Sequence, residues 1–366
     1  MQRILSQWVW PAITGLAIAL FVLEYTGWRS NTPPRPEQVN SYAAAVAKAT
    51  PSVVNIYTAK VVNDSAAPRN SRFNQLNRGY NQQRVERSLG SGVILSEDGI
   101  ILTNRHVIAD ADAIQVLLND NRNARAELLG ADPATDLAVL KIDLDQLSPA
   151  IIGDSNAAQV GDVVLAIGNP LGFGSSVTQG IISALGRYGF QGGAYYEDYI
   201  QTDATIHMGN SGGALINAKG ELLGINSLIY TGGNTANASA GIGISLAIPI
   251  NLATFVAQDL IDYGQVIRGW MGVSVQPFIP DTHQPNVGAL LVTQTVANGP
   301  ADRAGITPGD IITAINNEPV TDGRITMHRI ALLRPGDIVT VTLIDENEIT
   351  KELSVVLGSL QQAPQN

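Results

Sequence analysis

Short runs of apolar, largely β-branched residues recur along this chain, and turn signals such as Asp98-Gly99 and Gly161-Asp162 separate them. Runs of this length suit strands better than helices, and their rhythm is typical of a β-barrel or a β-sandwich. Glycine supplies 36 of the 366 residues and only 15% of the residues are charged, which agrees with a turn-rich globular fold. The clearest runs are 53–57, 92–95, 114–118, 137–142 and 163–167. We therefore expect a mainly β fold.

The length of the chain exceeds one ordinary domain, so two or three units are expected. A helix predicted at about 250–263 ends at Gly264, and a new set of strands and apolar residues follows it. We expect a first folded domain over residues 42–263 and a second over residues 265–357. A polar tail, 358–366, ends the chain.

The N-terminal segment 4–23 has no formally charged residue. A helix of this length spans the hydrocarbon core of a bilayer, which is about 30 Å thick. No small-x-small cleavage site follows the segment, which favours a retained membrane anchor over 1–27 rather than a cleaved secretory signal. Residues 28–41 include several prolines and are expected to form an extended spacer. The few flanking arginines do not decide the orientation of the anchor.

The charge and composition of the chain exclude several functions. A formal net charge of −10, with no block of lysine and arginine, argues against binding to nucleic acid, because phosphates repel an acidic surface. The chain has no cysteine, so thiol catalysis, disulfides and cysteine metal ligands are excluded. Its four histidines are scattered, and no motif has the spacing of metal ligands. We expect neither a metal nor a cofactor.

The strongest local signal for chemistry is Gly-Asn-Ser-Gly-Gly at residues 209–213. Ser211 in this setting can act as a nucleophile, while the backbone N–H groups of Gly209 and Ser211 stabilise the charge that develops on a substrate carbonyl oxygen. Taken alone, the segment is also compatible with an ordinary glycine-rich hairpin. A serine nucleophile further needs a base, because its hydroxyl is a poor nucleophile at neutral pH.

Two other segments can supply the partners of Ser211. His106 follows the apolar run 100–102, and Asp136 stands directly before the apolar run that begins at residue 137. Each alone is more often a structural histidine or a turn aspartate. Together the three occur in the order His, Asp, Ser, which is the chain order of chymotrypsin. We therefore expect Ser211 as nucleophile, His106 as general base and Asp136 as the group that orients the histidine.

Five segments resemble the motifs of the HtrA family of ATP-independent envelope proteases, and the resemblance extends from about residue 42 to residue 357. The resemblance implies a trypsin-like double six-stranded β-barrel, with the catalytic residues in the cleft between the barrels, and assembly as a homotrimer. The matching segments are 89–94, 103–107, 135–141, 168–170 and 209–213.

The second domain resembles the core of a PDZ domain in two segments, 301–312 and 315–320. Such a domain binds the C-terminus of a peptide as an added strand and captures its carboxylate on backbone N–H groups. The residues that match the peptide-binding loop are Trp270, Met271, Gly272 and Val273. Without the two downstream motifs, these four residues would be explained equally well as the start of an apolar strand.

An anchor, one protease domain and one PDZ domain together resemble the stress-sensor members of this family. The resemblance implies a single-pass inner-membrane protein whose two domains lie in the periplasm. C-terminal peptides of misfolded outer-membrane proteins would bind the PDZ domain and relieve inhibition of the protease, which would cleave a membrane-bound anti-sigma factor. Segment 185–190 resembles the start of the family's sensor loop, and Arg187 within it is a candidate for relaying PDZ occupancy; an ordinary solvated loop arginine is the alternative.

Two departures from the stress-sensor pattern leave other functions open. Met208 stands directly before Gly209, where that pattern has a histidine. In the pattern, a peptide next to this histidine switches to form the oxyanion hole, so the equilibrium between the inactive and active forms is left open here. Residues 63–87 are polar and without periodicity, and we expect a surface loop longer than the pattern has. A general quality-control protease or chaperone that degrades misfolded envelope proteins is therefore one alternative. A peptide-binding scaffold with a dormant protease fold is another.

Overall fold

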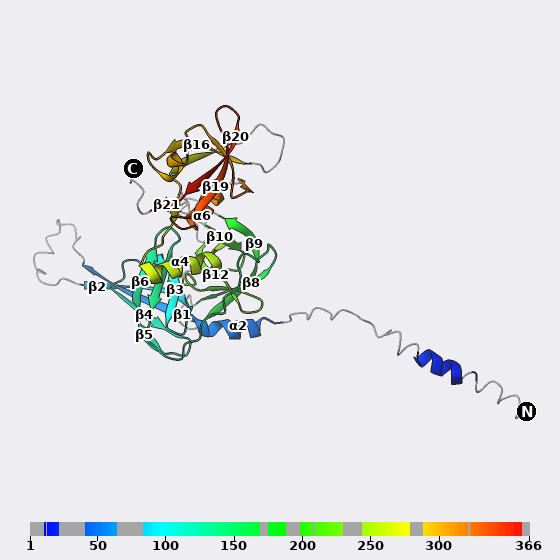
Figure 1. Ribbon diagram of the computed structural model, residues 1–366. Coiled ribbons are helices and arrows are strands. Elements are labelled where there is room, and N and C mark those ends of the chain that lie inside the picture. The colour runs from blue at the N-terminus through cyan, green and yellow to red at the C-terminus, as the bar shows by residue number, and fades with distance from the viewer. Residues whose placement is uncertain are drawn as a thin grey trace, which may run out of the picture. The chain divides into compact units, whose positions relative to one another are not determined.

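The protein is described here from a computed structural model, shown in Figure 1. The structure describes residues 11, 13–21, 41–63, 83–168, 175–187, 198–207, 209–229, 244–278, 288–320 and 323–360. Residues 13–21 are helical. Within the described part of the chain, no helix is both long enough and apolar enough to cross a membrane. Half of the predicted anchor segment 4–23, and all of the spacer 28–41 except residue 41, lie outside the described residues.

The first large element is a seven-stranded antiparallel sheet with the strand order β5-β4-β1-β2-β3-β7-β6. Inward residues alternate along β1, where Val54 and Ile56 are fully buried in the apolar core of this sheet. Its strands are β1 (Val53–Asn63), β2 (Gln83–Ile94), β3 (Ile100–Asn104), β4 (Ala113–Leu117), β5 (Asn123–Arg125), β6 (Glu127–Asp132) and β7 (Leu137–Lys141). The family resemblance implies six strands in each barrel, and this sheet has seven among the described residues.

The pairing of β1 with β2 corrects the expectation of a surface loop over residues 63–87. The ladder between these two strands continues as far as the pair Asn63↔Gln83, so residues 83–87 belong to a strand. Residues 64–82 lie outside the described part of the chain. The prediction was wrong for the strand residues because it relied on apolar periodicity. Backbone pairing in an extended two-stranded ribbon does not require a buried face.

The second element is a closed six-stranded barrel with the order β10-β13-β12-β11-β8-β9. Closure leaves no unpaired sheet edge, and Ile182, Ile200 and Leu215 lie in its apolar core. Its strands are β8 (Val163–Gly168), β9 (Ser176–Arg187), β10 (Tyr199–Thr202), β11 (Ala214–Asn217), β12 (Leu222–Ile229) and β13 (Ser245–Pro249). The expected apolar runs are therefore confirmed as parts of strands β1, β2, β4, β7 and β8.

Helices are few in this part of the protein. Helix α4 (Ile250–Tyr263) packs against β6, β7 and β12 with a buried apolar face. It ends at Gly264, whose left-handed backbone (φ 71°) lets its N–H donate to the Leu260 carbonyl, so the predicted helix and its end are confirmed. Shorter helices are α2 (Ala43–Ala49), the 3-10 helix η1 (Thr50–Ser52) and α3 (Arg105–Ile108).

The C-terminal part of the chain is a separate sheet with the path β15-β16-β17-β19-β20, in which β18 also pairs with β17. Strands β14 and β21 form a second, two-stranded sheet, and helices α5 and α6 contribute residues to the apolar core of this part of the chain. The strands are β14 (Gly269–Trp270), β15 (Val273–Phe278), β16 (Ala289–Thr295), β17 (Ile311–Ile315), β18 (Glu318–Pro319), β19 (Ile338–Ile344), β20 (Thr350–Val356) and β21 (Gly358–Ser359). The helices are α5 (Pro300–Arg303) and α6 (Gly323–Ala331).

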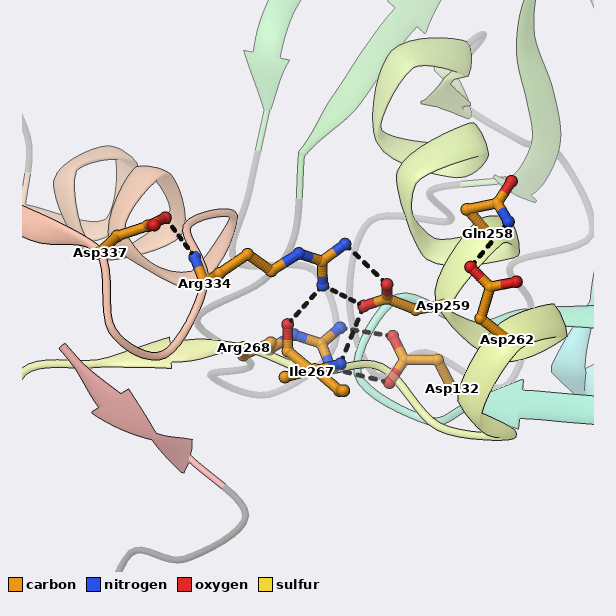
Figure 2. A network of polar contacts seen from close by, with 8 residues as sticks. All are labelled: Asp132, Gln258, Asp259, Asp262, Ile267, Arg268, Arg334 and Asp337. Carbon is orange, nitrogen blue, oxygen red and sulfur yellow. Dashed lines mark hydrogen bonds and ion pairs between the residues drawn. The ribbon is translucent and has the colours of Figure 1, made fainter.

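A network of ion pairs surrounds the segment that follows α4, as Figure 2 shows. The guanidinium of Arg268 forms two bonds with the carboxylate of Asp132, at 3.1 and 2.6 Å. The guanidinium of Arg334 forms two with the buried carboxylate of Asp259, at 2.6 and 2.7 Å, and lies 4.4 Å from the ring centre of Phe255. The hydrogen bond to Asp259 raises the pKa of Arg334. Asp259 also accepts from the backbone N–H of Ile267 (2.9 Å).

Replacing Asp259 with alanine is expected to lower the free energy of unfolding by about 1–3 kcal/mol, because the N–H of Ile267 and the guanidinium of Arg334 lose an acceptor. Urea unfolding followed by tryptophan fluorescence measures this change. The matched control is Asp262→Ala, less than one turn further along α4, where an exposed carboxylate accepts from Gln258. The control is expected to change stability by less than about 0.5 kcal/mol. Equal effects of the two variants would contradict this account of the network.

Candidate active site

His106 and Asp136 are brought together by a short helix and a turn in the first sheet. Strand β3 ends at Asn104, and α3 begins at the next residue, which places His106 in the first turn of that helix. Asp136 directly precedes β7, the neighbour of β3 in the sheet. Its Oδ2 lies 2.5 Å from Nδ1 of His106, and its Oδ1 accepts from the backbone N–H of His106 at 2.9 Å. Both carboxylate oxygens therefore fix the position of the histidine.

The backbone of Asp136 is held in an unusual conformation. Its φ of 57° lies in the left-handed region, which costs a residue with a side chain about 1–2 kcal/mol. Two donors hold its carbonyl oxygen: the N–H of Arg105 (2.9 Å) and Nδ2 of Asn104 (3.1 Å). Asn104 is fully buried. Sequence reasoning did not select Asn104, because an asparagine at the end of an apolar strand gives no local sign of a partner 32 residues away.

Ser211 lies at the other side of the site, in the loop that precedes β11 of the closed barrel. Its hydroxyl donates to the carbonyl oxygen of Ser227 at 2.9 Å. Within the described residues it makes no hydrogen bond to His106. The structure therefore joins two of the three predicted residues directly, while the hydroxyl of the third points to a backbone carbonyl.

The carbonyl groups of Gly209, Asn210 and Ser211 all accept hydrogen bonds. The carbonyl oxygen of Gly209 accepts from Oγ of Ser91 (2.7 Å), that of Asn210 from the N–H of Gly213 (2.9 Å), and that of Ser211 from the N–H of Ser91 (2.9 Å). In contrast, the N–H groups of Gly209 and Ser211 donate to no acceptor among the described residues. Gly209 has a φ of 95°, which favours glycine. Two amide donors are therefore available for an anionic oxygen.

The two residues named as regulatory are differently placed. Met208 lies outside the described residues, so nothing in the structure bears on its predicted role. Arg187 ends β9, is exposed, and its Nε donates to Oε1 of Gln201 at 3.0 Å. Most of the predicted sensor loop after Arg187 also lies outside the described residues. In the described part of the chain, no cluster of histidine and carboxylate side chains could hold a metal ion.

The predicted peptide-binding loop joins β14 to β15 at one end of a groove of about 260 Å³. The carbonyl of Met271 accepts from Ala301 and that of Gly272 from Val296, both at 2.9 Å. Among the described residues, the N–H groups of Met271 and Gly272 have no acceptor. Gly272 has a φ of 81°, and an added Cβ would lie 3.3 Å from the Trp270 ring. The loop therefore presents free amides, as a carboxylate site requires.

The walls of this groove were only partly predicted. The groove runs between β15 and α6, and its apolar wall outside the loop consists of Met327, Ile330, Ala331 and Leu360. Leu360 belongs to the segment predicted as a polar tail, yet β21 pairs with β14 and the N–H of Leu360 donates to the Arg268 carbonyl (3.1 Å). Beside the groove, burial and then the nearby Arg268 and Arg329 lower the pKa of His328 to about 4, so this histidine is neutral at pH 7.

Comparison with known proteins agrees with both parts of the chain. A family model described as a trypsin-like peptidase domain matches residues 90–225, and a PDZ domain model matches residues 291–344. The chain is 42% identical to the serine endoprotease DegS of Salmonella typhimurium over 322 residues, which cover 86% of this chain and 85% of that protein. It is 38% identical to a probable periplasmic serine endoprotease, DegP-like, of Pseudomonas putida, covering 90% of this chain and 72% of that protein.

A solved structure, the HtrA-type protease AlgW with a decapeptide, is similar with a TM-score of 0.71 and 42% identity, covering 89% of this chain and 100% of that one. The fold and these matches define a trypsin-like serine endopeptidase that carries a PDZ domain. This class replaces the alternative of a scaffold with a dormant protease fold. The chain belongs to the HtrA family of serine proteases.

Proposed function

We propose that this endopeptidase is a membrane-anchored stress sensor of the periplasm. C-terminal peptides of misfolded outer-membrane proteins bind the PDZ groove and relieve inhibition of the protease, which then cleaves a membrane-bound anti-sigma factor. The observation that carries the proposal is the pair of free amides of Met271 and Gly272 at the end of an apolar groove, where a peptide carboxylate fits. The relatives named DegS, and the AlgW structures with a decapeptide and with a tripeptide, support it.

The proposed arrangement of the chain follows the sequence. Residues 1–27 anchor the protein in the inner membrane as a single span, and residues 28–41 form the spacer. Residues 42–263 are the protease domain and 265–357 the PDZ domain, to which β21 and Leu360 add the first residues of the predicted tail 358–366. Three copies assemble as a homotrimer.

The proposed chemistry assigns one role to each residue of the site. His106 takes the proton of the Ser211 hydroxyl as Oγ attacks the scissile carbonyl, and the N–H groups of Gly209 and Ser211 stabilise the oxyanion. Asp136 holds the imidazole by Nδ1 and stabilises its protonated form. His106 then gives the proton to the leaving amine, and water hydrolyses the acyl-enzyme through the same base.

The hydrogen bond of Ser211 supports a resting state for the protein without peptide. Its hydroxyl donates to the Ser227 carbonyl, so this bond must break before His106 can accept the proton. A bound peptide can favour the reactive arrangement only if it binds that arrangement more tightly than the resting one. We propose that PDZ occupancy supplies this difference, with Arg187 at the end of β9 as a relay and Met208, which precedes Gly209 in the sequence, as a second regulatory residue.

Asn104 is proposed as a positioning residue for Asp136. Replacing it with alanine removes one of two donors to the Asp136 carbonyl, which lets the carboxylate shift relative to the imidazole. The expected result is a loss of about 10- to 100-fold in kcat with little change in KM, measured with a fluorogenic peptide substrate. Asn104→Leu keeps a similar size but lacks the donor and is expected to behave alike. The exposed Asn123→Ala is the control, and an equal kcat for all variants would contradict the role.

A general quality-control protease is the second candidate function. The similarity to a DegP-like periplasmic protease favours it. The two functions differ in how the protein cleaves an unrelated unfolded substrate such as labelled casein. A stress sensor is expected to cleave casein slowly, with or without peptide, and to cut an anti-sigma factor at a defined site. A quality-control protease is expected to digest casein into many fragments.

A further inference from the structure

The loop that carries Ser211 is tied to the first sheet by one buried residue, Ser91. Ser91 lies in β2, where it pairs with Asn55 of β1, and it is fully buried. Its Oγ donates to the carbonyl oxygen of Gly209 (2.7 Å), and its N–H donates to that of Ser211 (2.9 Å). Ser91 is thus 118 residues away from Gly209 in sequence and joins the first sheet to the closed barrel.

These two bonds control the orientation of peptide planes around the nucleophile. In a trans peptide the carbonyl of one residue and the N–H of the next point in opposite directions, so fixing the carbonyl fixes the amide. Ser91 Oγ holds the plane between Gly209 and Asn210, and Ser91 N–H holds the plane between Ser211 and Gly212. The plane between them carries the N–H of Ser211, one of the two proposed oxyanion donors.

Ser91 and Thr103 pack tightly against Gly212 of the Ser211 loop. Oγ1 of the buried Thr103 donates to the carbonyl oxygen of Ser91 at 2.7 Å. A Cβ added to Gly212 would lie 2.1 Å from that same oxygen and 2.4 Å from Oγ1 of Thr103. The loop therefore lies directly against the pair Ser91 and Thr103, without space for it to slide.

We infer that Ser91 is a positioning residue of the oxyanion hole, which holds the Ser211 loop in the conformation that leaves its amide donors free. Thr103 supports Ser91 in this role. The inference rests on the proposed role of Ser211 as nucleophile. Neither residue touches the substrate, so the role is exerted through the loop and is felt in the transition state, where charge develops on the substrate oxygen.

The test is a kinetic comparison of Ser91→Ala with a matched control, Ser52→Ala, in the full-length protein. Ser52 is equally buried, and its Oγ also donates to a backbone carbonyl at 2.7 Å, that of Ala49. We expect Ser91→Ala to lower kcat on a fluorogenic peptide about 10- to 100-fold with KM within about twofold. A peptide aldehyde, whose adduct oxygen occupies the oxyanion hole, should bind more weakly by a similar factor. The control should keep the parental kcat.

Two further variants keep the test decisive. Thr103→Val, which removes the donor behind Ser91, should lower kcat less than Ser91→Ala does, and Ser91→Thr, which keeps a hydroxyl, should restore part of the activity. A parental kcat and aldehyde affinity in Ser91→Ala would overturn the inference, as would a loss that appears in KM alone. Ser211→Ala is measured in parallel. If that variant stays active, the proposed nucleophile is wrong; if it is inactive while Ser91→Ala is fully active, only the inference about Ser91 fails.

Discussion

Ser211→Ala is expected to lower the rate of peptide-bond cleavage by about 10⁴-fold or more, because it removes the hydroxyl that is proposed to form the acyl-enzyme. Among the described residues, the hydroxyl of Ser211 makes one hydrogen bond, to the Ser227 carbonyl, so its removal should cost little stability. Cleavage of a fluorogenic peptide and labelling by a fluorophosphonate measure the effect. Labelling should disappear together with turnover.

The control for this variant is Ser354→Ala, an exposed serine on β20. It should retain both activity and labelling. Turnover by Ser211→Ala within tenfold of the parent, at equal thermal stability, would contradict the assignment of the nucleophile.

Gly272→Val is expected to weaken the binding of C-terminal peptides by about 10- to 100-fold, which corresponds to the loss of a charge-assisted hydrogen bond. The backbone of Gly272 is left-handed, and a side chain there would press on Trp270 and Pro300. The loop must then rearrange and withdraw its amides from the groove. Fluorescence anisotropy with a labelled peptide measures the affinity, and the increase in cleavage that the peptide causes should be lost in parallel.

Gly309→Val is the matched control for Gly272→Val. Gly309 also has a left-handed backbone, with φ 103°, but an added Cβ would meet no atom within 4 Å. This variant carries a similar conformational cost without a contact at the groove, so its peptide affinity should equal that of the parent. The same loss of affinity in both variants would show that conformational cost, rather than the loop amides, controls binding.

The local parts of the fold could be predicted because their signals lie in adjacent residues. The short apolar runs became strands, and helix α4 ends at Gly264, where the backbone turns left-handed. The match of the chain order His, Asp, Ser to a known family also located the segments that hold His106 and Asp136. The extension of β1 and β2 was missed, because paired backbones in a ribbon need no apolar pattern.

The supporting residues of the site could not be found in this way. Ser91 and Asn104 act through bonds to residues 118 and 32 positions away, and a serine or asparagine at a strand position gives no local sign of such a partner. Leu360 falls in the predicted polar tail because its neighbours are polar, although the pairing of β21 with β14 brings it to the groove between β15 and α6. The direction of the Ser211 hydroxyl is likewise a property of the three-dimensional structure.

The most direct test of the proposed function is cleavage of the periplasmic part of a candidate membrane-bound anti-sigma factor by the full-length protein. The rate is measured with and without peptides that carry the C-termini of outer-membrane proteins, and the Ser211→Ala variant serves as the blank. We predict an increase of about 5- to 150-fold at saturating peptide, the usual range for coupling between two sites, and no increase when the peptide carboxylate is amidated. An unchanged rate across the peptide series would contradict the account.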